Sequence, residues 1–299
     1  MPVTKPSRSA VEAAISLLLD RDPRVVAACR RQLRNWGDEA VPALRRAVAA
    51  GEPVLRLRAR AMLRSVLLHA WTEGVRQFSE ALNRAPLAAY RDYGVLQTGA
   101  LLLAGLDRDS TTDHGEVARA LDDHADAVRE LLRGRPRTAA RAARALRDYL
   151  GDQAGFASKH VDHYDVRANN LDEALESRLG TATALAALYV LVGRRTGMCI
   201  TAVGLPDHVI VRVHGARSVL IDPSRGGRIV THADCIRGVR RRGYTGPASS
   251  CLRELDDREL LLCLLDGLHR VHGYREDAEV LATIRRARAS LSARARRSC

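Results

Sequence analysis

His208 and Asp222 are the two residues whose types and spacing could do chemistry. Aliphatic stretches at 207–213 and 218–223 read as two strands around a turn centred on Gly215. His208 and Asp222 are equally far from that centre, and residues equidistant from the turn of an antiparallel hairpin lie opposite each other. A carboxylate beside a histidine fixes the tautomer of the imidazole and raises its basicity. The spacing therefore predicts a His–Asp pair on adjacent strands.

These strands belong to a small antiparallel sheet, with a further strand expected at 201–204. Successive side chains of a strand point to opposite faces. The alternation places Ile210 and Arg212 on the same face as His208, and the three valines 209, 211 and 213 on the other face.

A buried helix must pack against this sheet. The stretch 178–193 has no charge after its first residue. It is shorter than the roughly 20 apolar residues that span a membrane, so a helix inside a folded core is expected. Thr181 is a natural N-cap, and Gly197 is a natural stop after two arginines in the last turn, Arg194 and Arg195.

A His–Asp pair beside a buried helix N-terminus is the arrangement of a Cys-His-Asp thiol site. In such a site the helix N-terminus lowers the pKa of the thiol, the histidine takes its proton and the aspartate orients the histidine.

The sequence resembles the transglutaminase-like core superfamily, and within it the bacterial SirB-type branch. The resemblance spans about residues 87–290 and is carried by 164–165, 170–171, 178–180, 185–189, 203–212, 220–227 and the helical tail 259–287. It implies a papain- or transglutaminase-like core, in which a buried helix packs on an antiparallel sheet, and a catalytic role for His208 and Asp222.

The position that the resemblance assigns to the nucleophile is Ala182. Catalytic relatives carry a thiol two residues after the glycine that begins the core helix, here Gly180, and a methyl group cannot attack an acyl carbon. Thr181 is explained as the N-cap, and Thr183 would need His208 to deprotonate its hydroxyl. The resemblance thus implies a pseudoenzyme.

The six cysteines leave one alternative open. They stand at Cys29, Cys199, Cys235, Cys251, Cys263 and Cys299, in no metal-ligand spacing, and read as reduced thiols. Cys199 is nearest to the core helix and could act as a displaced nucleophile for acyl transfer or peptide hydrolysis. Its packing role competes with that reading. No sequence argument brings Cys235 or Cys251 to His208.

No metal or cofactor is expected. His160, Asp162, His163 and Asp165 superficially resemble a metal cluster, but no helical pattern supports their spacing. Asn170 and Glu173 form the pattern of a capping box, which makes this segment a loop that enters a short helix at 171–178.

The composition favours helix over sheet. Alanine and leucine fill the apolar content of the 299 residues, and only 4% are aromatic. The net charge of +13 is almost all arginine spread through helical segments, so nucleic acid is an unlikely partner. No signal peptide, anchor or membrane partner is expected, and a cytoplasmic location is the default.

The N-terminal segment contains an internal repeat. Asp22-Pro23 and its following apolar positions 25, 29, 33 and 36 recur thirty residues later as Glu52-Pro53 with 55, 59, 63 and 66. Pro42 stands in the first turn of a second helix between the two copies. These residues resemble short HEAT-type helical hairpins, which imply a docking or packing surface.

The expected fold is helix-dominant α+β. Its parts are a disordered 1–9, HEAT-like repeats at 10–82, a transglutaminase-like core at 87–250 and a C-terminal helical extension at 251–299. The expected function is non-catalytic binding or regulation of an unknown protein or peptide through the vestigial cleft. His208, Asp222, Asn170, Asp207 and Arg225 are its candidate residues, Arg225 as an anion contact. The rivals are the displaced-thiol enzyme and an arginine-driven nucleic-acid scaffold.

Overall fold

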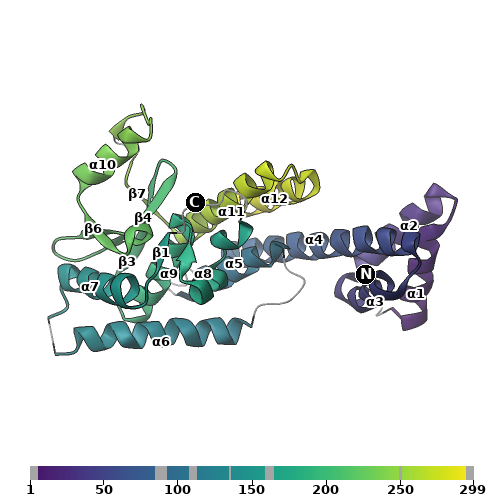
Figure 1. The fold of residues 1–299 in the computed structure, drawn as a ribbon, viewed down its shortest axis with the longest axis horizontal. Coiled ribbons are helices and arrows are strands. Elements are labelled where there is room, and N and C mark those ends of the chain that lie inside the picture. The colour runs from purple at the N-terminus through teal and green to yellow at the C-terminus, as the bar shows by residue number, and fades with distance from the viewer. Residues whose placement is uncertain are drawn as a thin grey trace. The chain divides into compact units, whose positions relative to one another are not determined.

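The computed structural model describes residues 6–84, 93–107, 113–134, 136–158, 165–248 and 251–293 (Figure 1). Its contacts divide the chain into two compact units, with the division between Gln77 and Phe78. Helices dominate both units, and the strands are all in the second. This confirms the expected helix-dominant α+β class.

The first unit consists of helices. They are α1 Arg8–Ser16, α2 Pro23–Trp36, α3 Val41–Ala50 and the first part of α4 Pro53–Arg84. Ser7 caps α1, because its hydroxyl accepts from the Ala10 N–H at 3.2 Å. The chain is therefore already helical at Arg8 and Ser9, which the sequence reading had placed in a disordered tail.

The two copies of the sequence repeat bury equivalent positions in one core. Leu33 of the first copy and Ala59 and Val66 of the second are buried in the same apolar cluster. Cys29, Trp36, Leu55 and Leu63 pack against that cluster. Pro23 and Pro42 lie in the first turns of α2 and α3, where a missing N–H leaves no helical hydrogen bond unmade.

The second unit is built around α9 Ala182–Arg195. Twelve of its fourteen residues are buried. Thr181 is its N-cap as expected, with its hydroxyl accepting from the Ala184 N–H at 3.3 Å. At the other end Gly197 has a φ of +81° and the Met198 N–H reaches the Gly193 carbonyl, which together close a Schellman motif.

A five-stranded antiparallel sheet packs against α9. Its order is β6-β5-β4-β3-β7, with β3 Ile200–Leu205, β4 His208–Val213, β5 Val219–Asp222, β6 Arg228–Val230 and β7 Arg253–Leu255. The first three strands lie close to the segments expected from sequence. The edge strands β6 and β7 have only three residues each, too few for an alternating pattern to reveal them.

Helices cover the rest of α9. Those in contact with it are α5 Tyr93–Ala104, α6 His114–Leu132, α8 Leu171–Ser177 and α11 Asp257–Tyr274. The remaining helices of the unit are α7 Ala139–Leu146, which continues into a π-helical segment Arg147–Gln153, α10 His232–Arg241 and α12 Ala278–Ser292. A separate two-stranded parallel sheet joins β1 Ala157–Ser158 to β2 Leu179–Gly180 just before α9.

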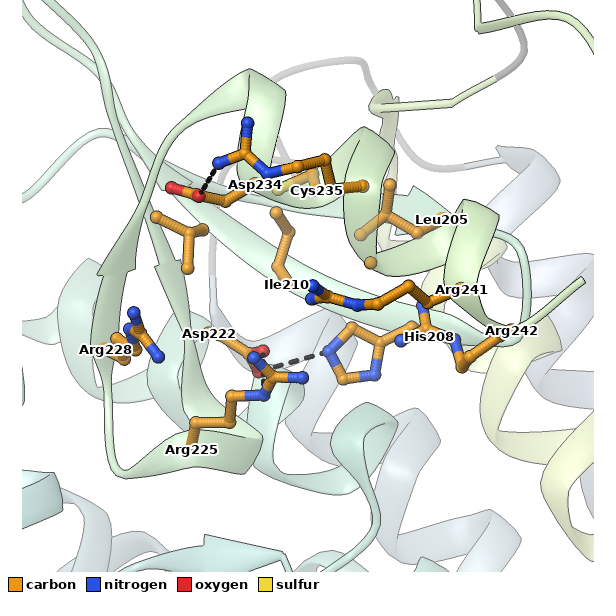
Figure 2. A pocket seen from close by; sticks show the side chains of 13 residues that line it. Leu205, His208, Ile210, Asp222, Arg225, Arg228, Asp234, Cys235, Arg241 and Arg242 are labelled. Atoms are coloured by element: carbon orange, nitrogen blue, oxygen red, sulfur yellow. Dashed lines mark hydrogen bonds and ion pairs between the residues drawn. The ribbon is translucent and has the colours of Figure 1, made fainter. Parts of the chain in front are cut away.

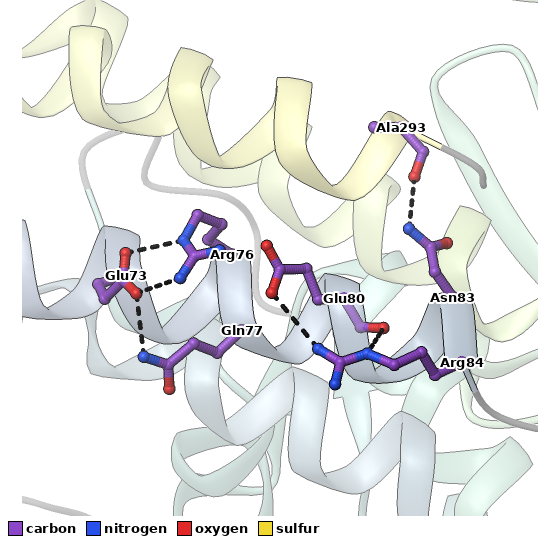
Figure 3. A network of polar contacts seen from close by, with 7 residues as sticks. All are labelled: Glu73, Arg76, Gln77, Glu80, Asn83, Arg84 and Ala293. Carbon is purple, nitrogen blue, oxygen red and sulfur yellow. Dashed lines mark hydrogen bonds and ion pairs between the residues drawn. The ribbon is translucent and has the colours of Figure 1, made fainter.

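The expected C-terminal extension is part of this unit. β7 completes the sheet, and α11 packs against both α5 and α9. The buried guanidinium of Arg258 donates to the Leu291 and Ala293 carbonyls at the end of α12 and to the Asn83 side chain at the end of α4. Asn83 in turn donates to the Ala293 carbonyl at 3.0 Å (Figure 3). The last carbonyls of α12 thereby find donors that the helix cannot supply.

A buried ion pair fixes the C-terminal end of α9. Arg194 donates to both carboxylate oxygens of Asp257 at 2.8 and 2.7 Å, and the side chains are only 13% and 2% exposed. Removing one partner of such a pair leaves an unpaired buried charge.

We predict that Arg194→Met lowers the free energy of unfolding by about 3–5 kcal/mol. The double variant R194M/D257L should recover much of that loss, because it removes both charges. Arg8→Met is the matched control: it breaks the exposed Arg8–Glu12 pair, which should cost no more than about 1 kcal/mol. Urea unfolding followed by circular dichroism measures all three, and a loss for R194M as small as for R8M would contradict the prediction.

The buried His124 contacts Arg178, which precedes α9. His124 Nε2 accepts from the Arg178 guanidinium at 2.6 Å, since an arginine can only donate. Nδ1 then carries the proton and donates to the Tyr149 hydroxyl at 3.0 Å. Burial, followed by the charge of Arg178, lowers the pKa of His124 to about 4.

The lowered pKa predicts an acid-sensitive core. Between about pH 6.5 and pH 4 the unfolded chain binds a proton at this position that the folded chain does not. The free energy of unfolding should therefore fall as the pH is lowered through that window. His124→Gln keeps an acceptor for Arg178 but cannot titrate, so its unfolding free energy should fall less steeply. Parallel slopes for the two proteins would refute this origin.

Candidate functional site

His208 and Asp222 form a hydrogen-bonded pair. His208 Nε2 lies 3.1 Å from Asp222 Oδ1, and the side chains are 16% and 7% exposed. An ionised carboxylate only accepts hydrogen bonds, so Nε2 carries the hydrogen and Nδ1 is left free in the neutral imidazole. The aspartate therefore fixes the tautomer, as the sequence spacing predicted.

The strand register differs from the prediction by one residue in its centre. Val211 pairs with Ile221 and Val213 with Val219, so the hairpin is centred on Ala216. Continuing this register puts Asp222 across from Ile210, and His208 becomes its diagonal neighbour. Both residues stay on the same face because the shift moves the pairing by two positions, and a diagonal pair is within reach of a long side chain.

Asp222 is held by more than the histidine. The Ser224 hydroxyl donates to Oδ1 at 2.6 Å, and the Ser224 N–H to the same oxygen at 3.1 Å. Arg225 Nε lies 3.5 Å from Oδ2. Burial acts to raise the pKa of the Asp222 carboxyl, but the His208 hydrogen bond and charge, with Ser224 and Arg225, outweigh it and hold that pKa below its usual value. The carboxylate is therefore ionised at neutral pH.

Two glycines let the chain turn sharply after Asp222. The turn Pro223–Arg225 is followed by Gly226 and Gly227, whose φ values are +62° and +74°. A Cβ on Gly227 would lie 2.9 Å from both the Arg147 Cα and the Tyr189 hydroxyl oxygen, so no larger residue fits there. This explains the Gly-Gly pair of the 220–227 motif.

The pair lies on the face of the sheet that α10 covers. Ile210, on the same face as His208, packs with Cys235 and Val239 of α10. The opposite face carries Ile200, which packs against Gly193 of α9, together with the valines of β4. The predicted alternation is therefore correct, and it directs the imidazole towards α10.

A pocket of about 340 Å³ opens beside the pair (Figure 2). Its apolar lining is Leu205, Ile210, Val230, Cys235 and Gly238, and its charged lining is His208, Asp222, Arg225, Arg228, Asp234, Arg237, Arg241 and Arg242. Arginine is thus the commonest residue in the wall. Several of these arginines belong to the basic run 237–242, but nothing in the sequence shows that α10 folds back over the sheet.

The pocket gathers three of the candidate residues. His208, Asp222 and Arg225 line it, whereas Ala182, Asn170 and Asp207 are not among its lining residues. Ala182 is the first residue of α9, as expected for the nucleophile position.

The structure places Asn170 at the start of α8 and Asp207 in a turn. Asn170 precedes α8 and is buried, but its side chain makes no cap hydrogen bond, so the expected capping box is not formed. The Glu173 N–H donates to Asp172 instead, at 2.9 Å. Asp207 follows Pro206 in the two-residue turn between β3 and β4 and has a φ of +54°, which aspartate tolerates better than most residues.

Cys199 cannot take the place of the missing thiol. It precedes β3, and its carbonyl accepts from the His214 N–H at the end of β4 that is remote from His208. Six residues of extended strand separate His214 from His208, which is about 20 Å. The sulfur of Cys199 is exposed at the wrong end of the hairpin.

Cys235 is the thiol that sequence reasoning missed. It lines the same pocket as His208 and Asp222. Burial, followed by the charges of Asp222 and Asp234, raises the pKa of its thiol to about 11. Cys251 is buried in the apolar cluster beside it. At neutral pH Cys235 is therefore a protonated thiol, which is a poor nucleophile.

Metal ligation finds no support in the described part of the chain. No group of three or more metal-ligating side chains occurs among the described residues. Of the residues that superficially resembled a metal cluster, His160, Asp162 and His163 lie outside them, and Asp165 is described. Across the same described residues, no helix is both long and apolar enough to cross a bilayer.

The fold agrees with the comparisons with known proteins. The sequence profile of the transglutaminase-like superfamily matches residues 115–266, which is half of the chain. The chain belongs to the transglutaminase-like superfamily.

Curated relatives are similar over part of the chain. Two proteins named UPF0162 protein, from Xylella fastidiosa strains Temecula1 and 9a5c, are 31% identical to it over 135 and 134 residues. Each match covers 43% of this chain and 48% of the relative, so the chain spans about half the length of the curated relatives it matches. No solved structure matches the chain.

We predict that Asp222→Asn lowers the free energy of unfolding by roughly 1–3 kcal/mol at pH 7, because it removes a charged hydrogen-bond acceptor from a buried site. The native pKa of Asp222 is below its unfolded value, so the stabilisation exists above about pH 4 and is lost as the pH falls through the native pKa. The difference between the two proteins should therefore shrink in acid. Asp207→Asn, in the exposed turn, is the control and should change little at any pH.

Proposed function

We propose that this protein is a non-catalytic member of its superfamily and that the pocket beside His208 and Asp222 binds a ligand without transforming it. The observation that carries the proposal is the side chain at the start of α9. Ala182 stands where the resemblance to catalytic relatives expects a thiol, and it offers no nucleophile.

The chemistry of the pocket supports the proposal. His208 and Asp222 satisfy each other, with Ser224 and Arg225 completing the set around the carboxylate. A His–Asp pair without a thiolate can orient and donate hydrogen bonds, but it cannot form the covalent acyl intermediate of a thiol enzyme.

Three further features that the sequence predicts belong to this proposal: the branch of the superfamily, the N-terminal repeats and the place where the protein works. We propose that the chain belongs to the SirB-type branch, that 10–82 are HEAT-like repeats acting as a scaffold surface, and that the protein works in the cytoplasm on a protein or peptide partner. The five described cysteines are free thiols, which is consistent with a reducing compartment.

A thiol enzyme is the second candidate, and one observation favours it: Cys235 lines the pocket of the His–Asp pair. Its raised pKa argues against it, because thiolate is the reactive form. Cys235 would need a ligand or a movement of α10 to lower that pKa.

Thiol labelling separates the two candidates. With iodoacetamide at pH 7.5, we expect the exposed Cys199 to label readily and Cys235 to label at least about tenfold more slowly, since the thiolate fraction sets the rate. His208→Ala should leave both rates unchanged. Peptide mass spectrometry measures each site.

Rapid labelling of Cys235 that disappears in His208→Ala would overturn the non-catalytic proposal. So would hydrolysis of p-nitrophenyl acetate by the wild type that is lost in Cys235→Ala. Cys199→Ala is the control, because hydrolysis that is lost in this variant comes from nonspecific reaction of an exposed thiol.

A further inference from the structure

The pocket beside His208 carries an excess of positive charge that the His–Asp pair does not use. Five arginines line it, against two aspartates. Both aspartates are already engaged: Asp222 as described above, and Asp234 with the Thr231 hydroxyl and the Arg237 guanidinium. The described residues provide no carboxylate partner for Arg228, Arg241 or Arg242.

These three guanidinium groups come from two elements. Arg228 begins β6, Arg241 ends α10 and Arg242 follows it as the C-cap. In Figure 2, Arg241 extends over the His208–Asp222 pair, Arg242 lies near the imidazole, and Arg228 lies at the other end of the pocket beyond Asp222. The three side chains thus line different parts of one pocket instead of forming one flat strip along a helix. A concave wall whose charges have one sign concentrates the electrostatic potential and attracts an ion of the opposite charge.

The pocket also has an apolar part. Leu205, Ile210 and Val230 line it, and Ile210 is 1% exposed. Small-molecule sites combine an apolar lining with a few placed polar groups and begin at about 300 Å³, which the volume of about 340 Å³ just reaches. The arrangement therefore suits a small organic body that carries a strongly anionic group.

The number of donors favours phosphate over carboxylate. One carboxylate is satisfied by a single bidentate guanidinium. A phosphate ester carries a charge of about −1.5 to −2 at pH 7 and three acceptor oxygens, so it can accept from more than one guanidinium group. Arginine also matches the geometry of phosphate oxygens better than lysine does.

We propose that this pocket, defined by Arg228, Arg241 and Arg242 around the His208–Asp222 pair, binds a small organic phosphate monoester. This inference adds a ligand class to the proposed non-catalytic function. It rests on that proposed function in one respect, namely that the bound phosphate monoester is released unchanged.

Two substitutions on α10 provide the decisive test. Arg241→Ala removes a lining guanidinium, and Arg240→Ala removes its neighbour, which does not line the pocket. Arg240 instead stacks on the Tyr244 ring at 5.8 Å and donates to the Tyr244 carbonyl. Both residues are exposed, so neither variant should unfold, and both change the net charge equally.

Calorimetric titration with phenyl phosphate measures the effect. We expect Arg241→Ala and Arg228→Ala each to weaken binding by roughly tenfold or more, the usual loss for a hydrogen bond to a charged group. Arg240→Ala should change it less than about twofold. Benzoate, which has the same ring with a carboxylate, should bind at least about tenfold more weakly than phenyl phosphate to the wild type. Thermal melting of each variant checks its folding.

Three outcomes would overturn the inference. Equal weakening by Arg240→Ala and Arg241→Ala would mean general charge attraction, and equal affinity for benzoate would remove the preference for phosphate. A single-stranded oligonucleotide that binds without competition from phenyl phosphate, and with a steep loss of affinity in salt, would make the arginines a nucleic-acid surface instead.

Phosphorus NMR of the same mixture separates this inference from the proposed function. Phenyl phosphate that binds and stays intact supports both. Binding with release of inorganic phosphate, lost in Arg241→Ala, would support the phosphate site but overturn the non-catalytic function. No binding of phenyl phosphate would overturn the site and leave the non-catalytic proposal to be judged by thiol labelling.

Discussion

The burial of α9 is the constraint on which the second unit depends. A helix of fourteen residues with twelve buried needs apolar partners on every side, and a single sheet covers only one. α5, α6, α8 and α11 supply the remaining sides. This is why the chain on both sides of the superfamily core, including the tail that sequence alone set apart, folds into one unit.

The ends of α9 are as constrained as its middle. Thr181 satisfies an N–H of the first turn, and the Schellman motif at Gly197 satisfies carbonyls of the last. The side chain of Arg194 is only 13% exposed, and its guanidinium donates hydrogen bonds to both carboxylate oxygens of Asp257. A buried polar group is tolerated only with such partners, and Asp257 lies 63 residues along the chain from Arg194.

Sequence predicted the elements of the core well because their signals are local. The charge-free run with capped ends specified α9, and alternating valines specified β4 with its two faces. The hairpin centre was wrong by one residue because the turn 214–218 has no residue pair that dictates a two-residue loop. The prediction that His208 and Asp222 meet is still correct, because a shift by two pairing positions keeps both side chains on one face. The capping box expected at Asn170 is not formed: the pattern is present, but the side chain of the buried Asn170 makes no cap hydrogen bond.

What sequence could not supply is the second wall of the site. α10 has its own strong capping box at Thr231 and Asp234, so its existence is encoded locally. Its position over β4 depends on the short edge strand β6 and on apolar contacts between Cys235, Val239 and Ile210. These contacts join segments about 25 residues apart. They turn an arginine run into a pocket lining and place Cys235 in the same pocket as the imidazole.

The two faces of the sheet give the protein two regions that selection can change separately. The face on α9 is closed, and most substitutions there disturb packing that the whole unit shares. The face under α10 carries the pocket, and its exposed arginines come from one helix end and one edge strand, where exchange of a side chain costs little stability. Substitutions in α10 and β6 can therefore change the lining of the pocket while the α9 core stays intact.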